Sequence, residues 1–356
     1  MRRALLFIGL LTGVVSSQGQ VQGQGRGVIK SRGRGLRLRS GPSKRGLLVI
    51  PGVGRSDRLR TLVSSLKLLE RNYLTGPRRS WDCVVYIYAP PSDVSFWGMK
   101  EELGYVNSLC STVEHTNKRV TENLYMVQPA LIKNVYSHVF VLLDDCKLLP
   151  DPDSVVPGSE PAFNLQRMLD IMEHNNLTLA SPRVLGANVG GGQAFRTLMQ
   201  AKPQPGTEGY SAIFVEWFAW LLTIRAYEAF WELLCPHVQP YGWGYDFWYD
   251  SYAKTRVPGH KMGIISTIEV KHEQDTTVPG SGRTETANVE TKWSAVQKQE
   301  KHYKEHLGVD LKTIRQSLKL QNTSWNGAVT GFLRSAPEGT GARARLPRAA
   351  RGSAID

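Results

Sequence analysis

The chain has 356 residues, 41% of them hydrophobic, which is enough for one large domain or two small ones. Its formal net charge of +13 comes from the two ends, because residues 1–46 contain ten Lys or Arg and no acid, and residues 333–356 contain five Arg and two acids. Residues 47–332 contain 29 basic and 29 acidic side chains, and this balance argues against the clustered basic face that a nucleic-acid-binding protein needs.

The first residues have the order of a secretory signal. Arg2 and Arg3 precede the apolar run Ala4–Val15, and small polar residues follow near Ser17. The run has 12 residues, which is too short for a helix that spans a bilayer. We therefore predict a signal peptide over residues 1–17, with a short signal anchor or a transit peptide as the alternatives.

The segments on either side of the central region have biased compositions. Residues 18–45 and 333–356 are rich in Gly and Arg and poor in large apolar side chains, which predicts a disordered basic spacer and a disordered basic tail. Residues 46–332 then form one candidate domain. Two N-x-S/T sequons, at Asn176 and Asn322, are consistent with a glycoprotein that passes through the secretory pathway.

Strand and helix patterns alternate along the candidate domain. Short apolar runs predict strands at 46–52, 82–90, 136–143, 177–182 and 259–267. Apolar residues at helical spacing predict helices at 56–69, capped by Ser56 or Asp57, and at 116–136, 164–174 and 291–320. This order predicts an α/β fold with a mostly parallel central sheet flanked by helices. The glycine-rich residues 186–209 predict a mobile loop, either a lid over a site or simple disorder.

The chain has four cysteines, Cys83, Cys110, Cys146 and Cys235. None of them is spaced as C-x-x-C, which argues against a structural zinc site. One or two disulfides or four buried thiols are all compatible with this pattern, and Cys83 and Cys110 are the pair nearest in sequence.

Two adjacent acids, Asp144 and Asp145, directly follow the apolar run that ends at Leu143. Adjacent carboxylates repel, and burying either one without a partner costs several kcal/mol. In open α/β sheets ligands bind outside the carboxyl ends of the strands, so the pair could hold a divalent cation that grips a diphosphate. A helix cap, a Lys or Arg partner, or a solvated turn would also explain the two acids.

Three further segments carry candidate functional residues. The stretch from Tyr241 to Phe247 combines two glycines, aromatic rings and one acid, Asp246, which could accept a proton from a sugar hydroxyl or simply cap a helix. His272 follows a predicted strand and could ligate a metal or lie on the surface. Glu216 is a charge inside an aromatic stretch. After the first strand, Gly52 belongs to a lone G-x-G, which is weak evidence for a nicotinamide cofactor.

The order of these segments resembles the nucleotide-sugar glycosyltransferases of the GT-A type. More narrowly, it is similar to a family of uncharacterised plant and algal proteins with a strand-end acidic triplet, a Val-Glu segment, a Trp-Gly-x-Asp turn and a closing strand that ends in His. The matching stretches here are Phe140–Leu148, Leu177–Pro182, Phe214–Asp246 and Met262–His272. The resemblance implies a single GT-A-like, Rossmann-like domain. It also implies a hexosyl- or pentosyltransferase of the secretory pathway, either secreted or in the Golgi lumen, acting on a glycan or glycoprotein acceptor.

The resemblance also implies a role for each matching residue. Asp246 would be the catalytic base if the enzyme inverts. Asp145, or position 146, would bind Mn²⁺ or Mg²⁺, and His272 would bind the metal or the diphosphate. The positions that would contact the donor nucleotide are Pro51, Gly52, Asp144, Asp145, Glu216, Trp243 and Gly244.

One position departs from the pattern, because Cys146 stands where the triplet has its last acid. A thiol is a soft ligand that suits Mg²⁺ and Mn²⁺ poorly. Either Asp145 holds the metal without it, or a cation such as Lys147 or an Arg replaces the metal, or the protein is an inactive GT-A-like domain that binds glycan.

Overall fold

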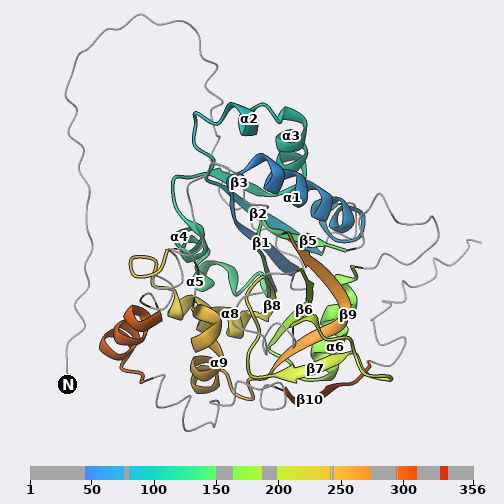
Figure 1. Ribbon diagram of the computed structural model, residues 1–356, viewed down its shortest axis with the longest axis vertical. Helices are drawn as coiled ribbons and strands as arrows, with labels where there is room; N and C mark the ends of the chain where they lie inside the picture. Colours follow the sequence, from blue (N-terminus) through green and yellow to red (C-terminus); the bar gives the residue numbers. More distant parts are fainter. Residues whose placement is uncertain are drawn as a thin grey trace, which may run out of the picture. The chain divides into compact units, whose positions relative to one another are not determined.

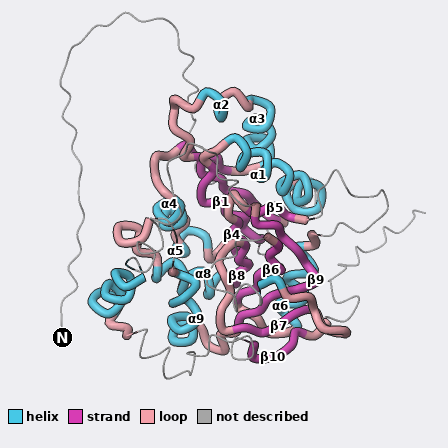
Figure 2. Tube along the Cα trace, in the orientation of Figure 1, coloured by secondary structure: helices cyan, strands magenta, loops and turns pink. Residues whose placement is uncertain are grey.

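The computed structural model describes residues 45–75, 80–149, 163–186, 199–240, 242, 244–273, 294, 296–310 and 329–335, and Figures 1 and 2 show their arrangement. The predicted signal, most of the spacer and tail, and Asn322 lie outside these residues. No helix in the described ranges is long and apolar enough to cross a membrane.

One mixed sheet joins all the described strands, in the order β10-β7-β9-β6-β8-β4-β1-β2-β3, with β5 paired to β9. The strands are β1 Arg45–Val53, β2 Trp81–Ile87, β3 Thr112–His115, β4 Tyr136–Leu142, β5 Cys146–Leu148, β6 Leu179–Leu185, β7 Gly209–Ala212, β8 Ala219–Thr223, β9 Met262–His272 and β10 Val329–Leu333. The pairs β1/β2, β2/β3, β1/β4 and β6/β9 are parallel, and β8, β7, β5 and β10 add antiparallel pairs.

Helices pack on this sheet and against one another. They are α1 Ser56–Leu69, continued by the π-helix Glu70–Leu74, α2 Val94–Trp97, α3 Lys100–Leu109, α4 Val120–Met126, α5 Pro129–Ile132, α6 Leu165–His174, α8 Ile224–Leu233, α9 Tyr245–Arg256, and helical residues 296–302, continued by the π-helix Tyr303–Leu307. Helix α1 packs on β5, α4 on β1, α8 on β4 and β8, and α6 on β6 and β9. The prediction of an α/β fold with a central sheet flanked by helices is confirmed.

The strand directions gather several strand ends at one edge of the sheet. Strands β4 and β6 are both antiparallel to β8, so they run in the same direction. Strand β9 is parallel to β6, and β1 and β2 are parallel to β4 through β1. The carboxyl ends of β1, β2, β4, β6 and β9 therefore share one edge, the edge where α/β proteins bind ligands.

Two predicted helices differ from the observed ones. The 116–136 segment forms two short helices, because Gln128 is extended (φ −70°, ψ 128°) before Pro129. A residue that precedes proline disfavours the helical region, so the first helix ends before it. At the start of α1 neither Ser56 nor Asp57 is the cap. The cap position belongs to Arg55, whose side chain instead forms an ion pair with Asp57 at 2.9 Å.

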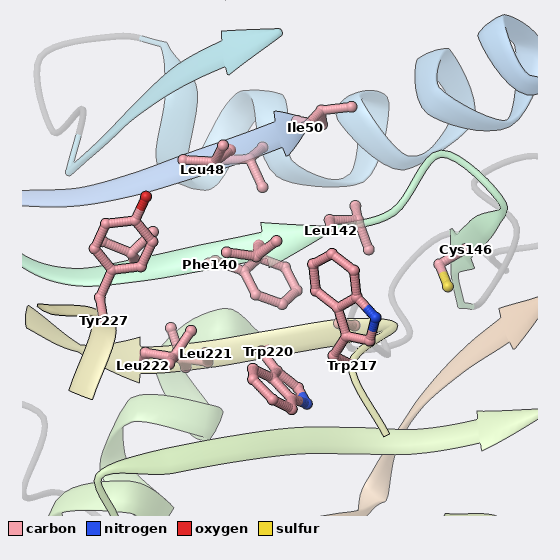
Figure 3. Packing of buried hydrophobic residues seen from close by; sticks show 14 of the residues in the cluster. Leu48, Ile50, Phe140, Leu142, Cys146, Trp217, Trp220, Leu221, Leu222 and Tyr227 are labelled. Atoms are coloured by element: carbon pink, nitrogen blue, oxygen red, sulfur yellow. The ribbon is translucent and has the colours of Figure 1, made fainter. Parts of the chain in front are cut away.

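The core on either side of β4 and β8 is rich in aromatic rings. Trp220 of β8 lies 5.3 Å from Phe230 of α8 and 5.0 Å from Tyr249 of α9, measured between ring centroids. All three side chains are almost completely buried. Figure 3 shows Trp220 beneath the strand that carries Phe140 and Leu142, so much of the aromatic stretch in the sequence forms the core.

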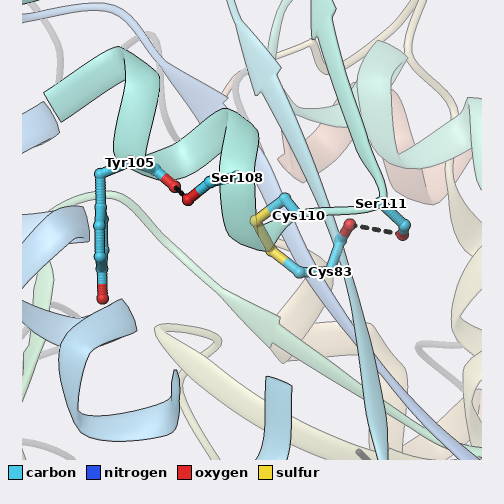
Figure 4. Close-up of a disulfide and its surroundings, with 5 residues drawn as sticks. All are labelled: Cys83, Tyr105, Ser108, Cys110 and Ser111. Atoms are coloured by element: carbon cyan, nitrogen blue, oxygen red, sulfur yellow. Dashed lines mark hydrogen bonds between the residues drawn. A yellow bond between two sulfur atoms is a disulfide. The ribbon is translucent and has the colours of Figure 1, made fainter. Parts of the chain in front are cut away.

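Cys83 of β2 and Cys110, which follows α3, form a disulfide (Figure 4). It closes a loop between residues 27 apart in the chain. By the chain-entropy model a loop of this size contributes roughly 3–4 kcal/mol to stability. Cys146 and Cys235 are free and buried.

Candidate functional site

The strand-end acids and the predicted histidine meet at this edge of the sheet. Asp145 Oδ2 lies 3.0 Å from His272 Nε2, although the two residues are 127 positions apart. The contact follows from the pairing of β5 with β9, which places Cys146 opposite His272. The Glu273 backbone N–H also donates to the Asp145 carbonyl oxygen at 2.7 Å. Asp145 and His272 are thus close enough to bind one ion together.

The surroundings of Cys146 do not suit it as a metal ligand. Its side chain is only 1% exposed, and Figure 3 shows it on β5, past the end of the strand carrying Leu142. The thiol donates to Asp145 Oδ1 over 3.6 Å, and burial followed by the nearby Asp145 raises the pKa of the thiol well above its usual value. A protonated thiol is a poor metal ligand. Cys146 therefore orients the Asp145 carboxylate from behind.

The two acids have opposite pKa shifts. Burial and the charge of Asp145 raise the pKa of Asp144 to about 8, although the Arg58 guanidinium opposes the shift. Burial also acts to raise the pKa of Asp145, but the His272 hydrogen bond and the charges of His272 and Arg58 hold it below its usual value. The edge thus carries one firmly ionised carboxylate and one that needs added positive charge to ionise at neutral pH.

Arg58, which the sequence analysis missed, belongs to a polar face of α1. Arg58 Nη1 donates to the Glu273 carbonyl oxygen at 2.9 Å, and Thr61 Oγ1 donates to Glu273 Oε2 at 3.2 Å. Ser65 Oγ accepts the Leu148 N–H at 3.1 Å. These three polar residues of α1 are buried, and they follow one another at intervals of three and four positions. That spacing inside an otherwise apolar helix face was the available sequence signal.

The G-x-G after the first strand has a packing role that the sequence did not reveal. A Cβ at Gly52 would lie 2.9 Å from the Tyr88 ring, and one at Gly54 would lie 2.1 Å from it. Tyr88 follows β2, its side chain is 38% exposed, and burial and the nearby Asp144 raise its pKa. The glycines therefore let an aromatic ring lie across the end of β1, beside the acids. The Pro51 carbonyl oxygen accepts a hydrogen bond from Asn123 Nδ2 at 2.8 Å.

The segment 216–218 connects the acids to the aromatic turn. The Phe218 carbonyl oxygen accepts the Leu143 N–H at 3.0 Å, and the Phe218 ring lies 4.5 Å from the His272 ring. On the other side, the Trp217 ring packs on Gly242, where a Cβ would lie 2.0 Å from Trp217 Cζ2. Glu216 begins this segment and is buried. Three predicted segments therefore meet through two consecutive aromatic residues.

The turn leads into helix α9. Gly244, with φ of 88°, is the N-terminal cap residue, and Asp246 lies in the first turn, half-buried. Asp246 Oδ1 accepts the Phe247 N–H at 3.0 Å. Gly244 packs against Gln299, whose Oε1 would be 2.5 Å from an added Cβ. Gly244 rather than Asp246 is therefore the cap of α9, and the side chain of Asp246 is partly exposed. Trp243 lies outside the described residues.

Replacing Gly242 by alanine is expected to destabilise the protein by about 3 kcal/mol or more. Its φ of 97° costs a side chain roughly 1–2 kcal/mol, and the overlap with Trp217 adds a packing penalty of about 1–3 kcal/mol. Chemical denaturation of both proteins measures the loss.

Gly259→Ala is the matched control, because Gly259 has a φ of 69° and nothing within 4 Å of an added Cβ. It is expected to show the backbone penalty alone, about 1 kcal/mol. Equal losses in the two variants would contradict the close packing of Trp217 on the turn.

The carboxylate oxygens and the imidazole nitrogen at the carboxyl edge of the sheet are atoms of the kind that bind a divalent cation. Within the described ranges no group of three or more His, Cys, Asp or Glu side chains is arranged to hold a metal ion. Asp145 and His272 nevertheless place a carboxylate oxygen and an imidazole nitrogen 3.0 Å apart, and Asp144 adds a second carboxylate whose charge is unfavourable there. Carboxylates are the ligands that suit Mg²⁺ and Mn²⁺, so such an ion would take its other ligands from a diphosphate or water.

The chain matches no protein-family model and no curated protein sequence. Among solved structures it is similar to the crystal structure of GalNAc-T7 with UDP, GalNAc and Mn²⁺, with a TM-score of 0.43 and 14% identity over 77% of this chain. It covers 55% of that structure's chain, about half its length. It is also similar to residues 1–349 of S. aureus TarS, with a TM-score of 0.41 and 10% identity over 79% of this chain and 76% of that one.

Proposed function

We propose that this protein is a GT-A-type glycosyltransferase of the secretory pathway, which transfers a hexosyl or pentosyl group from a nucleoside-diphosphate sugar to a hydroxyl of a glycan or glycoprotein. The observation that carries the proposal is the pairing of Asp145 with His272 at the carboxyl edge of the sheet, beside Asp144 and Arg58. A half-buried cluster with two acids, an imidazole and a guanidinium is suited to a charged ligand that brings its own cation.

The donor would lie along the carboxyl edge. Its base or ribose would face the exposed Tyr88 ring over Gly52, because an aromatic face offers a stacking surface for a flat or apolar group. Its diphosphate would lie near the start of α1, where free backbone N–H groups and the helix dipole favour anions. Pro51 lies near the carboxyl end of β1, on the same side. The segment 216–218, which begins with Glu216, would border the sugar together with Trp243 and Gly244.

Asp145 and His272 would hold Mn²⁺ or Mg²⁺, with Asp144 nearby. When bound, the ion would neutralise charge that develops on the leaving diphosphate. Two residues of this chain would support the ion site. Arg58 lies beside the same carboxylates and adds positive charge, and Cys146 keeps the Asp145 carboxylate oriented. Asp246 would accept the proton of the acceptor hydroxyl. It lies in the first turn of α9, and the turn before this helix packs on Trp217 through Gly242.

The function is tested by thermal shift and turnover. We expect nucleoside diphosphates to raise the melting temperature more with Mn²⁺ than without it, and we expect slow hydrolysis of the matching nucleotide sugar. Asp246→Asn is expected to lower turnover by about 100-fold, the lower end for loss of a general base, while the thermal shift by nucleotide persists.

Equal turnover in wild type and Asp246→Asn would remove Asp246 from the mechanism. Stabilisation by oligosaccharides but by no nucleoside diphosphate would contradict catalysis and would indicate an inactive, glycan-binding domain instead.

A further inference from the structure

The turn between α6 and β6 contains one of the two sequons, Asn176-Leu177-Thr178. The side chain of Asn176 is exposed, and its carboxamide makes no hydrogen bond to any described residue. Leu177 is not proline, so the triplet meets the chemical requirement for N-glycosylation. We propose that Asn176 is N-glycosylated.

The conformation of this turn presents the asparagine outward. Asn176 has a φ of 53° and follows the last helical residues of α6. Its N–H donates to the Glu173 carbonyl oxygen at 3.1 Å, and the Leu177 N–H donates to the Met172 carbonyl oxygen at 2.8 Å. These are the two hydrogen bonds of a Schellman motif, which turns the chain out of the helix through a left-handed residue. The Leu177 side chain is buried on one side, and Asn176 is left on the surface on the other.

The position of Asn176 is compatible with the proposed active site. Asn176 precedes β6, and Leu179 at the start of β6 pairs with Met262 at the start of β9. His272 lies at the other end of β9, beyond the Leu185–Lys271 pair that closes this ladder. Seven residues of β6 span about 20–24 Å. A glycan on Asn176 therefore grows from the amino edge of the sheet and leaves the carboxyl edge open.

The modification is a group transfer onto the carboxamide nitrogen. A bond forms between Asn176 Nδ2 and C1 of the first sugar of a lipid-diphosphate-linked oligosaccharide. The bond from C1 to the diphosphate oxygen breaks, the lipid diphosphate leaves with that electron pair, and Nδ2 gives up one proton. The transfer requires the secretory route that belongs to the proposed function, but it does not require this protein to be catalytic.

Both sequon residues also have structural roles, which a matched set of variants separates from glycosylation. Asparagine tolerates the left-handed conformation at this turn, and Thr178 Oγ1 lies 2.7 Å from His260 Nδ1. Asn176→Gly keeps the left-handed turn and removes the acceptor nitrogen. Thr178→Ser keeps the hydroxyl and the sequon. Asn322→Gln removes the second sequon, which lies outside the described residues.

The full-length chain, expressed in eukaryotic cells, is treated with an amidase that releases N-glycans and converts the linked asparagine to aspartate. We expect the treatment to increase the gel mobility of wild type, Thr178→Ser and Asn322→Gln. Peptide mass spectra of these three proteins should show the conversion of Asn176 to aspartate. The double variant Asn176→Gly with Asn322→Gln should show no change in mobility. Unmodified Asn176 peptide in the wild type would overturn the proposal. Nucleotide binding by Asn176→Gly, expected to be unchanged, is read separately, so a failure of the catalytic proposal is distinguishable from a failure of this one.

Discussion

Asp145→Asn is expected to lower nucleotide-sugar turnover by about 1,000-fold, equivalent to about 4 kcal/mol of transition-state stabilisation. Asparagine has the size of aspartate and can still contact His272, but it has no charge to hold a cation or to complement Arg58. The variant would therefore lose both the proposed metal ligand and the ionised member of the acid pair. Release of nucleoside diphosphate, followed at saturating Mn²⁺, measures the effect.

The fold of this variant should survive, because the substitution also removes the repulsion between Asp144 and Asp145. Circular dichroism and the melting temperature without ligand test this directly. Asp170→Asn, on α6, is the control and should keep wild-type turnover, because Asp170 accepts a hydrogen bond from Gln166 Nε2 of the same helix at 2.8 Å. Wild-type turnover in Asp145→Asn would exclude the strand-end acids from the reaction.

Asp144→Asn is expected to make the stability of the metal-free protein less dependent on pH. The pKa of Asp144 is raised to about 8, mainly by burial and by Asp145, whereas an unfolded aspartate has a pKa near its model value of 3.8. Between these values Asp144 binds more protons in the folded state than in the unfolded state, so its contribution to stability falls as pH rises from about 4 to about 8. Asparagine mimics the neutral form. The variant should therefore gain stability relative to wild type over this range. We expect a gain of about 2 kcal/mol, less than the full pKa shift would give, because Asp144 and Asp145 titrate as a coupled pair.

Urea unfolding at pH 5 and pH 8.5 measures this difference. Glu173→Gln, at an exposed position of α6, is the control, and its difference from wild type should stay within about 0.5 kcal/mol at both pH values. Added Mn²⁺ should stabilise wild type most at the higher pH, where protons compete least with the ion for Asp144, and should stabilise Asp144→Asn less. A stability difference between Asp144→Asn and wild type that does not grow from pH 5 to pH 8.5 without metal would contradict the buried, partly protonated state of Asp144.

Local sequence patterns predicted five of the ten described strands, together with α1 and α6. The apolar runs became β1, β2, β4, β6 and β9, and helix α1 covers the predicted span Ser56–Leu69. These elements follow from nearest-neighbour physics, because hydrophobic periodicity and turn residues act over a few positions. The prediction of one helix over 116–136 was wrong, because the restriction that Pro129 places on Gln128 outweighs the apolar pattern.

The acid pair and the histidine were recognised in the sequence as strand-end residues, but only the tertiary structure places Asp145 against His272 across 127 positions. That contact depends on strand order and on the direction of β9, which local patterns do not encode. The same holds for Cys146. The sequence showed a thiol where an acid was expected, and the pairing of β5 with β9 turns that thiol behind Asp145 as a hydrogen-bond donor.

The role of Arg58 also depends on tertiary contacts that the sequence pattern does not reveal. In the sequence it is an ordinary basic residue in the first turn of a helix, and its charge becomes important only because α1 packs on β5 and brings it to Glu273 and the acids. By itself the sequence determined where several of the strands and helices lie, and which of the predicted strands end in polar residues. Which of those ends meet was decided by the tertiary structure, because burial energy depends on contacts between segments far apart in the chain.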